Sequence, residues 1–221
     1  MTWTQYLAPL MKGAQITVMI SLTSIAFGTV LAFLAGIART SSNPIISGIA
    51  FVYVLLFRGT PLLVQLFWFY YALPLIGVSF DPITTGIMVL SLLTGAFGAE
   101  VVRGALMAVP QAQHEAARAL NFSKFHTLWH ISMPQAIIEM MPAFGNLAVQ
   151  NLKDTALVSL ISIADLTFQA QSLRNITLDS ATIYTMTLAG YFIIALGLML
   201  IIRFIEAKLR RGAAFPRSAH S

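Results

Sequence analysis

Long apolar runs separated by short charged segments are the feature that most limits how this chain can fold. A membrane-spanning helix requires about 20 mostly apolar residues. Five stretches meet or approach that requirement: 13–38, 59–80, 82–104, 135–161 and 180–203. Charged residues make up 10% of the chain, far below the roughly 25% typical of a soluble domain. We therefore predict an all-α membrane protein, with one transmembrane domain over 1–221 and about five spanning helices.

The distribution of charge predicts how this domain is oriented. Five spans place the polar loop 105–134 and the C-terminus on one side, and basic residues concentrate there while acidic residues mark the other side. The first side holds Arg39, Arg103, Arg118, Lys124, Arg203, Lys208, Arg210, Arg211 and Arg217. The other side holds Lys12 and Arg174 among Asp81, Asp165 and Asp179. We expect the N-terminus outside and the C-terminus in the cytoplasm.

The apolar segment 45–57 is ambiguous. It would form only about 20 Å of helix at 1.5 Å per residue, which favours an interfacial or partly inserted helix broken at 58–61. If it spanned the membrane, Arg39 would lie outside and Lys12 inside. Both residues are cationic, so the number of positive charges on each side stays the same and does not decide between the two topologies. Both topologies are compatible with the sequence of 45–57.

Composition excludes several chemistries. The chain has no cysteine, so disulfides, thiol catalysis and cysteine-based metal sites are impossible. It has no Gly-x-x-x-x-Gly-Lys-[Ser/Thr] phosphate loop, and no intramembrane nucleophile–base pair can be placed. His126 and His130 stand four residues apart without a third ligand, so we expect no metal. The net charge of +5 reports membrane topology rather than nucleic-acid binding.

Two features of the predicted helices concern packing. Gly28, Ala32 and Gly36 recur every four residues, a small-residue stripe that allows another helix to approach closely. Glycine enrichment is also ordinary in membrane helices, so the stripe alone does not establish such a contact. Pro142 is expected to kink the fourth span, which is compatible with gating and equally with simple packing.

The polar stretch 115–134 predicts a helical hairpin. Glu115–Leu120 is rich in alanine, the strongest helix former, and Glu115 is expected near the start of that helix, where a carboxylate complements the dipole. Asn121 suits the left-handed residue that ends a helix. Ser123 suits the cap of a second helix over 124–132, and Pro134 the first turn of the next span. The plain interpretation is a solvated connection between two spans.

This stretch resembles the EAA loop of bacterial ABC-importer permeases, with Glu115, Ala116, Ala117, Ile131 and Pro134 in register. Asn121 stands where the family has Gly, and Met133 where it has Leu. Four further segments resemble the histidine/glutamine/arginine-type, or polar amino acid, permeases: 57–66, 99–104, 152–159 and 164–167. The similarity extends over about 10–210.

The resemblance implies an ABC type I importer permease that performs no catalysis itself and works by alternating access. It implies a polar amino acid or related zwitterionic solute, such as an opine or an ectoine-like compound. The implied partners are a second permease chain, identical or homologous, two ATPase subunits that bind ATP and Mg²⁺, and an external solute-binding protein. The implied location is the bacterial inner membrane, in contact with lipid. An ATP-independent channel or facilitator is the alternative.

Three groups of residues are candidates for function. The resemblance implies an ATPase-coupling role for Glu115, Ala116, Ala117, Leu120 and Asn121. Polar residues inside predicted spans are candidates for a solute path, and these are Gln65, Asn146, Gln150, Lys153 and Asp154. Glu100 and Arg103 are spaced to form an ion pair on one helix, with Arg58 as a possible third member. That group is either structural or part of a gate.

Overall fold

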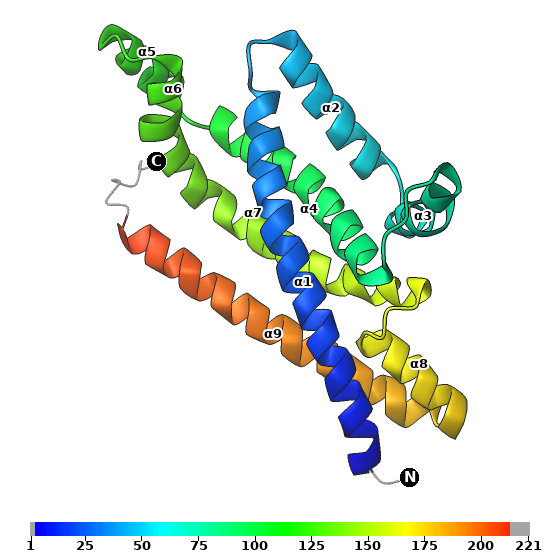
Figure 1. Cartoon of the computed structure of the whole chain (residues 1–221). Coiled ribbons are helices and arrows are strands. Elements are labelled where there is room, and N and C mark those ends of the chain that lie inside the picture. Colours follow the sequence, from blue (N-terminus) through cyan, green and yellow to red (C-terminus); the bar gives the residue numbers. More distant parts are fainter. Residues whose placement is uncertain (1–2, 213–221) are drawn as a thin grey trace.

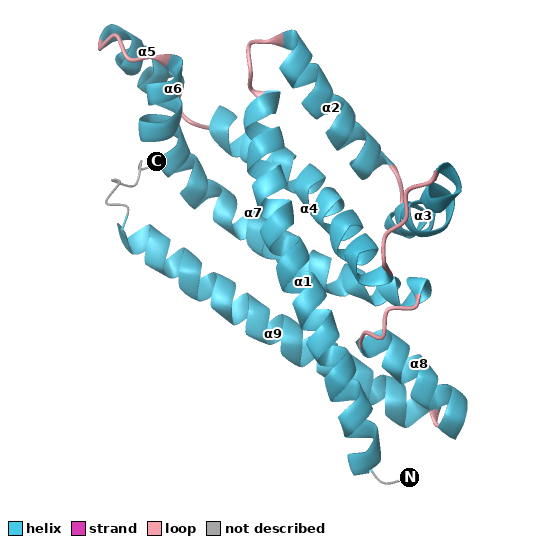
Figure 2. Ribbon diagram, viewed as in Figure 1, coloured by secondary structure: helices cyan, strands magenta, loops and turns pink. Residues whose placement is uncertain are grey.

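The computed structural model describes residues 3–212, and every regular element in that range is a helix (Figures 1 and 2). Arg217, one of the basic residues counted above, lies outside the described residues. The predicted all-α fold is confirmed. The main helices are α1 (Trp3–Arg39), α2 (Pro44–Gly59), α3 (Leu62–Phe67), α4 (Pro82–Met107), α5 (Gln111–Ala119), α6 (Lys124–Thr127), α7 (Met133–Asp154), α8 (Leu166–Thr177) and α9 (Ser180–Gly212).

Four short irregular helices complete the described chain. Two are π-helical turns, η1 (Trp68–Ala72) and η3 (Leu128–Ser132), and two are 3₁₀ helices, η2 (Leu73–Ile76) and η4 (Thr155–Ile161). Within the described range, α1, α4 and α9 are each long and apolar enough to cross a membrane. Two bent helix pairs, Pro44–Gly59 with Leu62–Ile76 and Lys124–Ile161 with Leu166–Thr177, raise the number of candidate spans to five.

The close contact between α1 and α4 is built on small residues. A Cβ atom added to Gly28 would lie 2.8 Å from the Thr94 Cβ, and one added to Gly36 would lie 2.6 Å from the Val102 Cβ. These separations are shorter than side chains tolerate, so the two helices approach this closely only because glycine occupies both positions. The small-residue stripe therefore serves helix packing.

The structure does not form the single helix expected over 59–80. The chain bends by 104° between α2 and the segment Leu62–Ile76. Pro61 disfavours helical backbone at the preceding residue, and Thr60 is accordingly extended, at φ −118° and ψ 143°. The break at 58–61 is thus where the sequence predicted it, but it ends α2 rather than beginning a long helix.

α2 packs alongside α4 in the bundle (Figure 1). The Tyr53 hydroxyl donates to the Leu92 carbonyl in the middle of α4, at 2.7 Å. Arg39, before α2, contacts Glu100 near one end of α4, whereas α4 begins at Pro82 at its other end. The chain must therefore run once along α4 between Arg39 and Pro82. Most of that length is covered by α2, and not by the segment 59–80 as expected. Placement in the bilayer stays a prediction.

Asp81 starts α4. Its carboxylate accepts a hydrogen bond from the Thr84 backbone N–H at 3.0 Å and so satisfies one of the free donors at the helix start. Hydrogen bonding to Thr84 also lowers the pKa of this carboxyl below its usual value.

Asn151 of α7 joins three helices inside the bundle. Its side-chain oxygen accepts hydrogen bonds from the hydroxyls of Ser21 at 3.3 Å and Ser24 at 3.0 Å, both on α1. Its amide nitrogen donates to the Thr94 hydroxyl on α4 at 2.8 Å. Asn151, Ser21, Ser24 and Thr94 are all buried, so polar groups that would be costly alone satisfy one another.

Asp165 also links helices through buried hydrogen bonds, at the start of α8. It caps α8 by accepting from the Phe168 backbone N–H at 2.8 Å, and its other oxygen accepts from the Tyr191 hydroxyl of α9 at 3.1 Å. The Leu166 N–H donates to the Thr17 hydroxyl of α1 at 3.0 Å. These bonds hold α8 between α1 and α9.

Candidate functional site

The turn of the predicted hairpin forms as expected. Asn121 adopts the left-handed conformation, with φ 54°, directly after the end of α5. The Phe122 N–H reaches back to the Ala117 carbonyl at 3.0 Å, and the Asn121 N–H to the Arg118 carbonyl at 2.9 Å. These bonds satisfy carbonyls that the end of the helix leaves free.

The second arm of the hairpin is continuous with the following long helix. The Ser123 hydroxyl accepts from the His126 N–H at 3.2 Å and caps α6, as predicted. Pro134 lies in the first turn of α7, also as predicted. The π-helical turn η3 joins α6 to α7 without a loop, and α7 continues through Pro142. The second arm of the hairpin and α7 therefore form one uninterrupted helical segment.

Glu115 departs from its expected position. α5 begins at Gln111 rather than near Glu115, so the carboxylate lies in the second turn, where the dipole effect has largely faded. It accepts a hydrogen bond from the Gln111 side-chain amide at 3.1 Å and is exposed.

The hairpin has an exposed face of mixed character. Glu115, Ala116, Leu120 and Asn121 are exposed, whereas Ala117 is only 1% exposed and packs inside the hairpin. Ala117 thus supports the hairpin and does not lie on its outer face. Three exposed aromatic residues near this face were not among the predicted site residues, although aromatic side chains in a polar loop are a recognisable signal of contact. They are Phe122, Phe125 and Trp129.

One hydrogen bond joins the two arms of the hairpin, and another braces it against the loop between α1 and α2. The His114 Nε2 lies 3.3 Å from the Ser132 hydroxyl, and the Lys124 ammonium donates to the Ser42 hydroxyl at 3.2 Å. The His126 and His130 rings stack with centroids 4.1 Å apart. Within the described residues, no group of three His, Cys, Asp or Glu side chains is placed to hold a metal.

Glu100 centres an ion cluster that differs from the expected one. Its Oε2 accepts from the Arg103 guanidinium at 2.8 Å, as predicted from their spacing on α4. Its Oε1 accepts from Arg39 of α1 at 3.1 Å. Arg58 does not join this cluster but lies over the Phe97 ring, 5.2 Å from its centroid. Arg39 was missed because its partner is 61 residues away and meets it only through the packing of α1 on α4.

The polar stripe of α7 forms as expected. Asn146, Gln150 and Lys153 are all exposed on this helix, and their spacing places them within a narrow arc. Gln150 donates to the half-buried Asp154 carboxylate at 2.8 Å. The stripe therefore combines two amides, a cation and an anion on the surface of α7.

Gln65 is not part of this stripe and instead forms hydrogen bonds at the bend after α2. It is only 5% exposed, and its amide nitrogen donates to the Phe57 carbonyl at 2.8 Å and to the Thr60 carbonyl at 3.0 Å. It thereby satisfies carbonyls freed where α2 ends, and it stabilises the bend.

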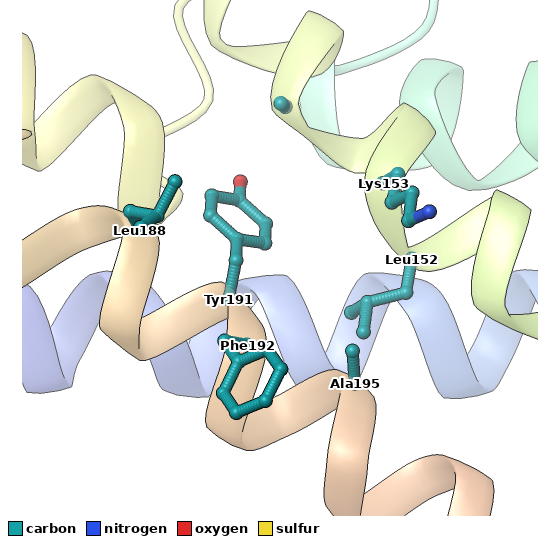
Figure 3. Close-up of a pocket in the computed structure, with 7 residues that line it drawn as sticks. Leu152, Lys153, Leu188, Tyr191, Phe192 and Ala195 are labelled. Carbon is teal, nitrogen blue, oxygen red and sulfur yellow. The ribbon is translucent and has the colours of Figure 1, made fainter.

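A pocket of about 400 Å³ opens beside the stripe, between α7 and α9. Figure 3 shows Lys153 of α7 and Tyr191 of α9 on its two walls. The Tyr191 hydroxyl is held by Asp165 and Thr167. The Lys153 ammonium points away from Tyr191 in Figure 3, so Lys153 contributes mainly its aliphatic stem to the lining. The remaining walls are apolar and consist of Leu152, Ala156, Leu188, Phe192 and Ala195.

The fold is that of an ABC type I importer permease, as the family match and the solved structures below show. The chain belongs to the family described as binding-protein-dependent transport system inner membrane component, whose model matches residues 24–211. The resemblance to polar amino acid permeases of ABC importers is confirmed.

Several relatives cover nearly all of the chain. A probable amino-acid ABC transporter permease protein of Sinorhizobium fredii is 51% identical over 96% of this chain and 91% of its own length. The glutamine transport system permease protein GlnP of Escherichia coli is 34% identical, covering 91% of this chain and 93% of its own. The L-cystine transport system permease protein TcyB of Bacillus subtilis is also 34% identical, over 91% and 87%.

Two solved structures share the fold. A chain from a crystal structure of an amino acid ABC transporter with histidines superposes with a TM-score of 0.86 at 31% identity, covering 93% of this chain and 96% of its own. A chain of the MetNI methionine ABC transporter in an inward-facing conformation gives a TM-score of 0.77 at 19% identity, over 95% and 99%.

Proposed function

We propose that this chain is the transmembrane permease subunit of an ATP-driven importer for an amino acid or a related zwitterionic solute. It acts in the bacterial inner membrane, paired with a second permease chain, identical or homologous. Two ATPase subunits bind ATP and Mg²⁺ on its cytoplasmic side, and an external binding protein delivers the solute. The relatives named for glutamine and for L-cystine support an amino acid as the solute.

The observation that carries this proposal is the continuity of the hairpin with α7. The exposed face around Glu115 and Leu120 offers a docking surface, and α6, η3 and α7 form one connected helical rod behind it. ATP binding and hydrolysis on the partner displace the hairpin, and the rod transmits that displacement to the stripe at Gln150 and Lys153. The outcome is alternating access driven from the cytoplasmic side.

The exposed stripe on α7 supports a solute path. Polar and charged groups at membrane depth are costly against lipid and therefore face a partner helix or a water-filled cavity. We place the second permease chain across such a cavity. Lys153 and Asp154 offer a cation and an anion for the two charges of a zwitterionic solute, while the pocket beside Lys153 offers apolar walls.

Substitution of Glu115 tests the coupling role. Glu115→Lys reverses the charge on the proposed docking face, so we expect loss of ATPase co-purification and of solute uptake, with membrane insertion intact. Gln113→Lys is the control, since it also places a lysine on α5 but about 200° away at 100° per residue. Equal ATPase recovery and uptake in Glu115→Lys, Gln113→Lys and the unsubstituted chain would refute the assignment.

The channel alternative is tested with the purified chain alone in liposomes. An importer permease shows no solute flux without its ATPase and ATP. Flux that persists without partners, and after replacement of 111–121 by a flexible linker, would establish a channel and reduce the hairpin to a connection.

A further inference from the structure

The segment Leu62–Ile76, comprising α3, η1 and η2 and called here the aromatic elbow, has no part in the transport steps above. It joins the end of α2 to the region before α4 and runs at 104° to α2. When α2 and α4 cross a bilayer, an element at this angle runs along the membrane surface rather than through it. Figure 1 shows α3 beside the end of α2 and the start of α4, away from the hairpin of α5 and α6.

One side of the elbow is fastened to the bundle. Leu66 is fully buried and packs in a cluster with Ile20, Leu90 and Ile161. Gln65 beside it holds the bend through its hydrogen bonds to Phe57 and Thr60. The elbow is thus held in place by contacts with α1, α4 and η4, and its orientation is determined by them.

The other side presents apolar and aromatic side chains outward. The exposed residues recur at helical spacing, and Leu75 is the most exposed of them, at 86%. They are Val64, Phe67, Trp68, Tyr71, Leu75 and Ile76. Neighbouring rings pack on each other, with Phe67 5.8 Å from Tyr71 between centroids and Trp68 5.1 Å from Phe69. This packing limits the conformational freedom of the exposed rings.

We propose that this face is an interfacial anchor that inserts among lipid headgroups at the non-cytoplasmic surface of the bilayer. Trp and Tyr are enriched at membrane–water interfaces because their rings combine an apolar body with a polar tip. No charged residue occurs between Arg58 and Asp81, so the face lacks the polar rim that surrounds a protein–protein contact. The uncharged aromatic face of the elbow therefore suits contact with lipid better than contact with a binding protein or a second permease chain.

Tryptophan fluorescence tests the anchor directly. The chain has three tryptophans, so Trp3→Phe with Trp129→Phe leaves Trp68 as its one tryptophan. The Trp68 signal is the difference from the same transporter with Trp68→Phe added, which subtracts the tryptophans of the partner subunits. The complete transporter is reconstituted in phospholipid vesicles that carry a nitroxide either near the headgroup or deep in the acyl chain. We expect blue-shifted Trp68 emission that the shallow nitroxide quenches several-fold more than the deep one, with little quenching by aqueous iodide.

Two outcomes would overturn the proposal. Quenching by iodide but not by lipid nitroxides would place Trp68 in water, and protection from both would place it against another protein chain. The matched reporter retains only Trp129, by Trp3→Phe with Trp68→Phe, and monitors the coupling hairpin at the other end of the bundle. Because the measurement needs no solute flux, failure of the anchor and failure of the transport proposal are distinguishable.

Discussion

Asn121 shows how one residue can end a helix and direct the chain into the next. Its backbone is left-handed, with φ 54°, a conformation that Gly and Asn adopt readily and β-branched residues resist. Asn121→Gly should therefore preserve the hairpin. Asn121→Val should destabilise the hairpin by about 1–2 kcal/mol. The measurement is the amount of ATPase that co-purifies with the chain, which should fall. Equal ATPase recovery by the Val variant would show that the turn is not needed for docking.

Asn151 carries a prediction about the interior of the bundle. Asn151→Leu removes the partner of Ser21, Ser24 and Thr94, and each unsatisfied buried group costs about 1–3 kcal/mol. We expect a clearly lower thermal midpoint for the detergent-solubilised chain. Asn146→Leu, on the same helix but exposed, is the control and should leave that midpoint nearly unchanged. Equal midpoints in both variants would refute a stabilising role for the Asn151 network.

At the scale of helical elements, the contact of α1 with α4 depends on the absence of side chains. A Cβ at Gly36 would lie 2.8 Å from the Ala99 carbonyl oxygen, a backbone atom that cannot move without shifting α4. Gly36→Ala should therefore separate the helices and lower the thermal midpoint. Gly48→Ala is the matched control, because a Cβ there meets nothing within 4 Å and alanine favours helix by about 1 kcal/mol. A Gly36→Ala variant as stable as Gly48→Ala would contradict the packing argument.

The elements also show why some local expectations succeeded. The hairpin turn, the Ser123 cap and the Glu100–Arg103 pair each involve residues within a few positions of one another. Such interactions follow from backbone geometry and helical spacing alone. The bend after α2 has the same local origin in Pro61, whereas its consequence, that α2 takes the place of 59–80 along α4, depends on contacts between distant segments.

At the scale of the whole molecule, the proposed solute path makes a prediction about water access. The chain lacks cysteine, so single cysteines can be introduced without a background. Asn146→Cys and Gln150→Cys in the assembled transporter should react with a membrane-impermeant thiol reagent, because a polar stripe lines a water-filled path. Leu200→Cys, on the apolar surface of α9, is the control and should stay unlabelled. Protection of both stripe positions throughout the ATPase cycle would exclude the path.

By itself the sequence determined that this chain is an all-helical membrane domain with a capped hairpin, because apolar length, caps and turn residues act over a few positions. Tertiary structure alone decided the partners of Arg39 and Asn151. Those partners depend on which helix faces meet, and both residues bond to residues more than 50 positions away. Periodicity identifies the polar face of a helix, but only packing determines whether that face binds a neighbouring helix, as at Asn151, or stays open, as at Gln150.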